Sequence, residues 1–317
     1  LRVDALCAIR YNITSSRKIF LLDKGGCMTM EYKDLIESKN SVRDYKEKEV
    51  DAATVKKIRD FAQSCERLDD SIGIDIRFMD NDTVYRQLDG YAGYKGILIN
   101  APHYMIVLSE KKDHYIENGG YVGESISVKA HSLGVDSCWI TFKDSRTVIE
   151  KLNIVTDKEV VAIMALGYGK KRFKKVTGNV TLGKGYANAD FQVKDSVISP
   201  RMPLEEIVFL DTWGNKATVD ELVNRAVYEP LNYARMAPST LNRQPWRFII
   251  DGGLLILTVR DDEDTNLYEE QIDAGIVMLY CKKVMRETLC EISWNLEPVE
   301  NKYNIPDNYK IVASCSM

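Results

Sequence analysis

Residues 237–246 read Ala-Pro-Ser-Thr-Leu-Asn-Arg-Gln-Pro-Trp, and this loop decides how the rest of the sequence is interpreted. Its two prolines restrict the backbone on either side of three polar side chains, those of Ser239, Asn242 and Gln244. A stiff loop that carries amide groups suits a flat heterocycle, because hydrogen bonds at the edge of the ring then fix its position. A polar connector between a helix and a strand is the weaker interpretation.

Two further segments carry candidate binding groups. Residues 39–43, Lys-Asn-Ser-Val-Arg, place two cations, an amide and a hydroxyl in one loop, which suits a phosphate group. From these residues alone, a solvated turn with Ser41 as a local cap is the better interpretation. Residues 134–142, Gly-Val-Asp-Ser-Cys-Trp-Ile-Thr-Phe, are either a core strand or an aromatic wall that lies against a ring.

The hydrophobic pattern predicts alternating helices and strands. We expect helices at 31–38, after Asp51, at 118–133 up to Gly134, after Asp144, at 220–236 and at 272–289. Strands are expected at 74–79, 103–108, 160–166 and 310–314, with a hairpin formed by 247–250 and 254–259. Residues 169–199 are expected to form a long connection.

The two halves of the chain echo each other. Residues 153–162 align without gaps on residues 304–313, and Gly120 precedes Trp139 by 19 positions, as Gly275 precedes Trp294. We interpret this as a duplicated α+β unit whose copies pack like the subunits of a homodimer, although coincidence between amphipathic helices is an alternative. The expected boundaries are 1–27 for a leader outside the fold, 28–200 for the first half and 201–317 for the second.

The leader has an origin that the sequence itself suggests. Residues 23–27 could be encoded by a purine-rich stretch typical of a bacterial ribosome-binding site. We therefore expect translation to begin at Met28 or Met30. The apolar runs before these residues are too short for a signal peptide.

Composition excludes several classes of function. The 317 residues are 45% hydrophobic and 28% charged, which is typical of a globular protein. With 43 basic and 47 acidic residues the net charge is −4, so no nucleic-acid partner is expected. No apolar stretch approaches the roughly 20 residues of a membrane helix. Seven scattered cysteines favour a reducing cytoplasm, and three histidines without ligand spacing predict no metal site.

Taken together, these segments resemble the FMN-dependent nitroreductase family. Residues 237–246 match its A-P-S-x-x-N-x-Q-P-W signature at every fixed position, and residues 39–43 resemble R-R-S-x-R with Lys and Asn replacing the first two arginines. Residues 133–140 resemble G-L-G-S-C-W-I, and residues 199–206 resemble the tail K-x-R-x-P-L-E-E. The resemblance extends over nearly all of the chain after Met30 and implies a nitroreductase-like α+β fold.

The motifs are divided between the halves. In the family, A-P-S-x-x-N follows R-R-S-x-R after one helix, but here that position reads Gln-Ser-Cys-Glu-Arg at 63–67. The loop occurs only in the second half, whose own R-R-S-x-R position has become residues 213–217. The resemblance implies a flavin bound between two subunits, so we predict a fused pseudo-dimer with one FMN per chain that functions as a monomer.

The resemblance also implies which positions hold the cofactor. Residues of the first half and Arg201 would bind the phosphate, ribityl chain and one ring face, and residues of the loop would approach from the second half. A backbone N–H near Thr141 or Phe142 would bond flavin N5, and no catalytic side chain is implied. The cofactor-binding residues expected are Lys39, Asn40, Ser41, Arg43, Lys95, Trp139, Ile140, Thr141, Phe142, Arg201, Pro238, Ser239, Thr240 and Asn242.

The resulting functional hypothesis is an oxidoreductase. The resemblance implies hydride transfer from NAD(P)H to FMN and then to a nitroaromatic or quinone in a ping-pong reaction. A non-catalytic flavin-binding, storage or sensing protein is the alternative. A different reaction on the same fold, such as dehalogenation or flavin cleavage, also remains open.

Overall fold

The computed structural model describes residues 21–22, 28–29, 31–170, 199–261, 263 and 265–317. Within residues 1–31, strand β1 (Leu21–Leu22) pairs antiparallel with β2 (Met28–Thr29). The rest of the predicted leader and most of the predicted connection at 169–199 lie outside the described residues. All other elements belong to a second unit, Tyr32–Met317.

The first sheet has the strand order β3-β4-β6-β5, and every neighbouring pair is antiparallel. Its strands are β3 (Ile74–Asp80), β4 (His103–Ser109), β5 (Asp136–Ile140) and β6 (Glu159–Gly167). Its helices are α1 (Tyr32–Ser38), α2 (Ala52–Ser64), α3 (Asn81–Leu88), α4 (Tyr115–Ser132) and α5 (Ser145–Lys151). As predicted, Asp51 and Asp144 cap α2 and α5 by accepting backbone N–H groups three residues on.

The second sheet has the order β10-β9-β8-β7. Its strands are β7 (Val208–Leu210), β8 (Trp246–Asp251), β9 (Leu254–Arg260) and β10 (Tyr309–Ser316), and its helices are α6 (Val219–Asn224), α7 (Tyr228–Ala234) and α8 (Leu267–Thr288). Short 3₁₀ turns lie at Leu204–Glu206 and Thr240–Asn242. The predicted hairpin is β8 and β9.

The helix predicted at 220–236 is wrong as a single element. The chain turns at Ala226, which has φ = +59°, and the helix resumes at Tyr228. Pro230 lies in the first turn of α7, where a missing N–H costs nothing because that position has no intrahelical acceptor. The proline therefore marks a new helix start, which hydrophobic spacing alone did not reveal.

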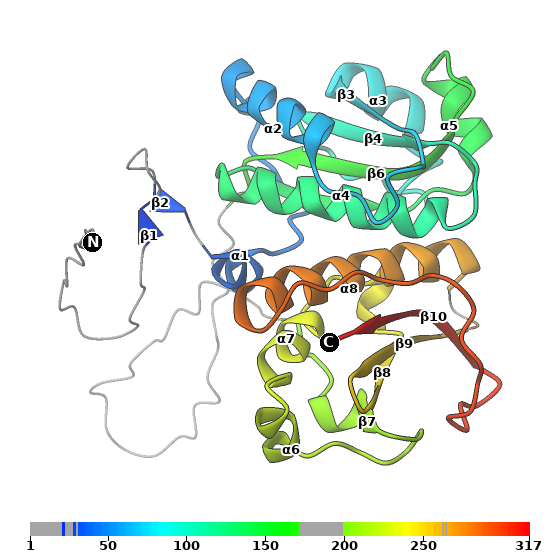
Figure 1. Ribbon diagram of the computed structural model, residues 1–317. Coiled ribbons are helices and arrows are strands. Elements are labelled where there is room, and N and C mark those ends of the chain that lie inside the picture. Colours follow the sequence, from blue (N-terminus) through cyan, green and yellow to red (C-terminus); the bar gives the residue numbers. More distant parts are fainter. Residues whose placement is uncertain (1–20, 23–27, 30, 171–198, 262, 264) are drawn as a thin grey trace, which may run out of the picture. The chain divides into compact units, whose positions relative to one another are not determined.

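Helices α4 and α8 lie side by side between the two sheets (Figure 1). Neither Gly120 on α4 nor Gly275 on α8 has room for a side chain. A Cβ on Gly120 would lie 2.5 Å from the carbonyl oxygen of Ile272, and a Cβ on Gly275 would lie 2.0 Å from that of Glu117. Each glycine thus contacts the residue three positions before the other glycine, which makes the crossing of the two helices nearly symmetric.

Positions that the sequence repeat aligns have similar strand pairing and backbone conformation in the two halves. Ile140 pairs with Ile163 across β5 and β6, and Asn295 pairs with Ser314 in the second sheet, each one residue after a tryptophan of the echo. Asn153 and Asn304, at the start of the aligned runs, have φ = +51° and +56°. The correspondence ends at residues 213–217, where Trp213 packs against Phe209 beside β7 instead of following the course of residues 39–43.

No helix in the described ranges is long and apolar enough to cross a membrane.

Candidate functional site

Residues 39–43 run beside the strand that carries Trp139. Ser41 forms a parallel bridge with Ser137, and the Val42 N–H donates to the Ser137 carbonyl at 3.0 Å. Burial raises the pKa of the Cys138 thiol, and the nearby charges of Arg43 and Lys39 oppose this shift. Two of the three segments singled out in the sequence therefore lie together.

A buried carboxylate, Glu124 on α4, ties this region to the second half. It forms an ion pair with Lys39 at 2.9 Å, and the exposed fractions of these two side chains are 0% and 7%. It also accepts the Trp139 indole N–H at 2.8 Å and the Tyr280 hydroxyl of α8 at 2.9 Å. Three donors surround this carboxylate, which lets the charge remain buried.

The residues of the loop at 39–43 differ in how available they are to a ligand. The positive charge of Lys39 is already paired, so Lys39 supplies little net charge to a phosphate. Asn40, Ser41 and Arg43 are exposed. Among the described residues, neither the Ser41 hydroxyl nor the Arg43 guanidinium has a hydrogen-bond or ion-pair partner, so both are open to an anion.

The loop at 237–246 has an unusual backbone that several contacts hold. Leu241, Asn242 and Gln244 all have positive φ, of +52°, +57° and +48°. The Thr240 N–H donates to both carboxylate oxygens of Asp273 at 3.0 Å, and the Ser239 hydroxyl accepts the Gln244 N–H at 2.9 Å. These contacts hold the loop against α8 and stabilise its turns.

Arg201 contacts this loop. Its guanidinium donates to the Asn242 side-chain oxygen and, at 3.0 Å, to the Met236 carbonyl. Burial raises the pKa of Tyr280 strongly, as does Glu124, whereas the charge of Arg201 acts in the opposite direction. Arg201 is therefore bonded to the loop and close enough to Tyr280 for its charge to act there.

Helix α8 contacts both the loop at 237–246 and the Glu124 cluster. Asp273, which holds the loop, and Tyr280, which contacts Glu124, are seven residues apart and lie on the same face of the helix. Two helical turns separate them by about 10 Å along the axis.

The remaining expected residues lie around the end of β5. The Gly93 N–H donates to the Thr141 carbonyl at 2.7 Å, which brings the turn containing Lys95 to this end. Lys95 is exposed at φ = +54°, and its ammonium lies 5.5 Å from the centre of the Tyr94 ring. Ile140 is buried, whereas Phe142 contacts Tyr268 of α8 with a ring separation of 5.3 Å. Pro238 is partly buried in the loop.

Sequence reasoning missed Glu124, Asp273 and Tyr280. Each is a polar group on a buried helix face, and Glu124 and Asp273 are acidic residues inside apolar stripes. An acidic residue in an apolar stripe was the available signal, because such a charge requires buried partners.

Comparisons with known proteins identify the family and the fold. A family model described as "Putative TM nitroreductase" matches residues 31–283. A solved nitroreductase structure from Thermotoga maritima has the same fold, with a TM-score of 0.55 and 17% identity over 95% of this chain and 99% of that chain. A Bacteroides fragilis nitroreductase with bound FMN gives a TM-score of 0.38 and 20% identity over 49% of this chain and 100% of that chain. No curated protein matches the sequence.

Proposed function

The chain belongs to the TM nitroreductase family, and we propose that it is an FMN-dependent oxidoreductase with one flavin site built from both halves of a fused pseudo-dimer. The observation that carries this proposal is the contact set of Glu124. This carboxylate joins Lys39 and Trp139 of the first half to Tyr280 of the second. The same helix face that carries Tyr280 holds the loop at 237–246 through Asp273.

The residues present fit the phosphate end of FMN. Arg43 and Ser41 offer a cation and a hydroxyl without partners among the described residues, and Arg201 lies on the other side, next to Asn242. Asn40 belongs to the same exposed loop. We assign Lys39 a positioning role, because its charge is paired with Glu124.

The residues at the end of β5 would hold the ring. Glu124 fixes the Trp139 indole through its N–H. The backbone from Trp139 through Phe142 would line one ring face, with Lys95 at the edge and residues 238–242 approaching from the second half. Their fixed positions would orient the ring and exclude water from one side.

When bound, FMN would supply hydride transfer from NAD(P)H to a small-molecule oxidant such as a quinone or nitroaromatic. The Bacteroides fragilis nitroreductase with bound FMN and the putative NADH oxidase from Clostridium acetobutylicum suggest this choice of cofactor and reductant. We propose no catalytic side chain and no metal.

Absorbance spectroscopy tests the proposal. The purified chain mixed with FMN is expected to retain the flavin through gel filtration, to lose its yellow colour under NADPH without oxygen, and to regain it on addition of a quinone. A chain that retains flavin but is not reduced by NADH or NADPH would be a binding or storage protein. A chain that retains no flavin would refute both the enzymatic function and the binding or storage function.

A further inference from the structure

The near-symmetric crossing of α4 and α8 gives the loop at 237–246 a counterpart in the first half. Asp273, two residues before Gly275, accepts the Thr240 N–H. Asn118, two residues before Gly120, accepts the N–H groups of Leu68 and Asp69 at 3.0 and 3.2 Å. The chain after α2 is therefore held on α4 as the chain after α7 is held on α8.

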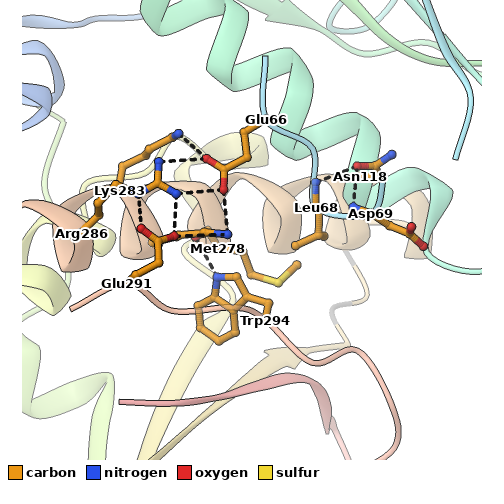
Figure 2. A network of polar contacts seen from close by, with 10 residues as sticks. Glu66, Leu68, Asp69, Asn118, Met278, Lys283, Arg286, Glu291 and Trp294 are labelled. Atoms are coloured by element: carbon orange, nitrogen blue, oxygen red, sulfur yellow. Dashed lines mark hydrogen bonds and ion pairs between the residues drawn. The ribbon is translucent and has the colours of Figure 1, made fainter. Parts of the chain in front are cut away.

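A dense group of charges lies next to this counterpart loop (Figure 2). The Glu66 carboxylate contacts the Lys282 ammonium at 2.7 Å, the Lys283 ammonium at 2.6 Å and the Arg286 guanidinium at 3.1 Å. Glu291 contacts the same guanidinium. Three cations of α8 thus converge on one carboxylate that comes from the first half.

A buried hydroxyl lies close enough to this group for its charges to act on it. Tyr121 on α4 is 1% exposed, and its hydroxyl has no hydrogen-bond partner among the described residues. Burial raises the pKa of Tyr121, Glu66 raises it further, and the charge of Arg286 opposes the shift. An unsatisfied buried donor costs free energy, which a hydrogen bond to a further acceptor would offset.

We propose that Lys282, Lys283 and Arg286, together with Tyr121, form a second anion-binding site, related to the first by the near-symmetry of the halves, and that Glu66 occupies it. The ligand class is a phosphate or phosphate monoester, whose oxygens accept hydrogen bonds from several cations as the Glu66 carboxylate does. Glu66 excludes such a ligand from the natural chain and thereby limits the chain to one phosphate-bearing ligand.

The charges support this assignment. Burial would raise the pKa of Glu66, but hydrogen bonds from the three cations outweigh this effect and lower it to about 2. The carboxylate is therefore ionised at neutral pH and permanently fills the site. Without it, the positive charges of Lys282, Lys283 and Arg286 would be less compensated, and an anion would be attracted. The occupation of this site by Glu66 does not depend on a flavin at the first site, whereas the limit to one phosphate-bearing ligand rests on the proposed function.

The test compares the thermal stability of Glu66→Ala and the natural chain in increasing inorganic phosphate, with ionic strength held constant by chloride. We expect Glu66→Ala to be less stable in chloride and to gain stability with the logarithm of phosphate concentration, as a bound ligand requires. The natural chain should gain less. Phosphate bound near Arg43 would stabilise both proteins alike, so it cancels in the comparison.

Three further variants make the result specific. Glu150→Ala removes an exposed glutamate paired with Arg146 and should respond like the natural chain. Lys283→Ala in the Glu66→Ala background should abolish the extra gain. Glu66→Ser, which also removes the carboxylate but keeps a polar side chain, provides a second variant for phosphorus NMR if Glu66→Ala does not fold. Equal phosphate responses in the natural chain, Glu66→Ala and Glu66→Ser would overturn the proposal and leave Glu66 as an ion pair between the halves.

Discussion

Tyr280 on α8 donates its hydroxyl to the Glu124 carboxylate on α4 at 2.9 Å, and this bond links the halves where Lys39 and Trp139 also meet Glu124. Tyr280 and Glu124 are 156 positions apart. A bond between such distant residues forms only when both halves are folded and packed. The integrity of the candidate site therefore depends on the contact between the halves.

Replacing Glu124 by Gln should strongly destabilise the chain. The substitution leaves the Lys39 ammonium buried without a counter-charge, and breaking such a pair typically costs about 3–5 kcal/mol. Tyr280→Phe removes one neutral donor and should cost about 1–2 kcal/mol. Urea unfolding of both variants measures the difference. Equal losses would show that the ion pair is not the dominant contact.

Gly275→Ala should separate the two central helices. Its Cβ would lie 2.0 Å from the Glu117 carbonyl, and relieving such overpacking usually costs about 1–3 kcal/mol. Gly253→Ala is the matched control, because its Cβ would meet nothing nearer than the Met317 carbonyl at 3.9 Å. Thermal unfolding should show a lower Tm for Gly275→Ala only. An unchanged Tm in both would contradict the close crossing.

The free energy of unfolding of Asp273→Asn, relative to that of the natural chain, should increase as the pH rises. Burial raises the pKa of Asp273 well above its usual value, so its ionisation in the folded chain is costly. That cost appears as the pH rises above about 4, where the unfolded carboxyl ionises. Asparagine keeps an acceptor for the Thr240 N–H, as Asn118 does for Leu68. Urea unfolding at pH 5 and pH 8 should therefore show a growing advantage of the variant; an advantage that shrinks with pH would contradict the account.

The stability difference between Glu66→Gln and the natural chain should depend on pH with the sign opposite to that of Asp273→Asn, because Glu66 stabilises the folded chain when it is ionised. Because the folded pKa of Glu66 is about 2, its stabilising effect is complete above about pH 5 and is lost as the pH falls towards 2. The natural chain should therefore exceed the variant in stability at pH 7 and approach it at pH 3. A difference independent of pH would show that the ionisation of Glu66 is not responsible.

Local sequence signals predicted much of the fold because they act over a few residues. Asp51 and Asp144 were identifiable as caps, whereas the duplication inferred from the echo around Trp139 and Trp294 stays a prediction. The break at Ala226 was missed because the apolar spacing continues across it. Glu124 was missed because its partners come from α1, β5 and α8, and no local pattern specifies such distant contacts.

For the candidate site, too, local motifs supplied some residues, and others depend on contacts between distant segments. The motifs supplied Ser41, Arg43 and Asn242 as candidates, which stay predictions, whereas the pairing of Lys39 with a buried carboxylate depends on packing. The phosphate-binding role of Lys39 and the pseudo-dimeric flavin site stay predictions. Ser41 and Arg43 are the most informative residues for testing these predictions, because neither side chain has a partner among the described residues.

A calorimetric titration of FMN into the chain tests the central claim, that one flavin site spans both halves. We predict one FMN per chain, with affinity weakened by about 1–3 kcal/mol in Arg43→Ala of the first half and also weakened in Asn242→Ala of the second. Arg59→Ala, which removes an exposed arginine on α2, should bind as the natural chain does. Two FMN per chain, or full affinity in either Arg43→Ala or Asn242→Ala, would contradict it.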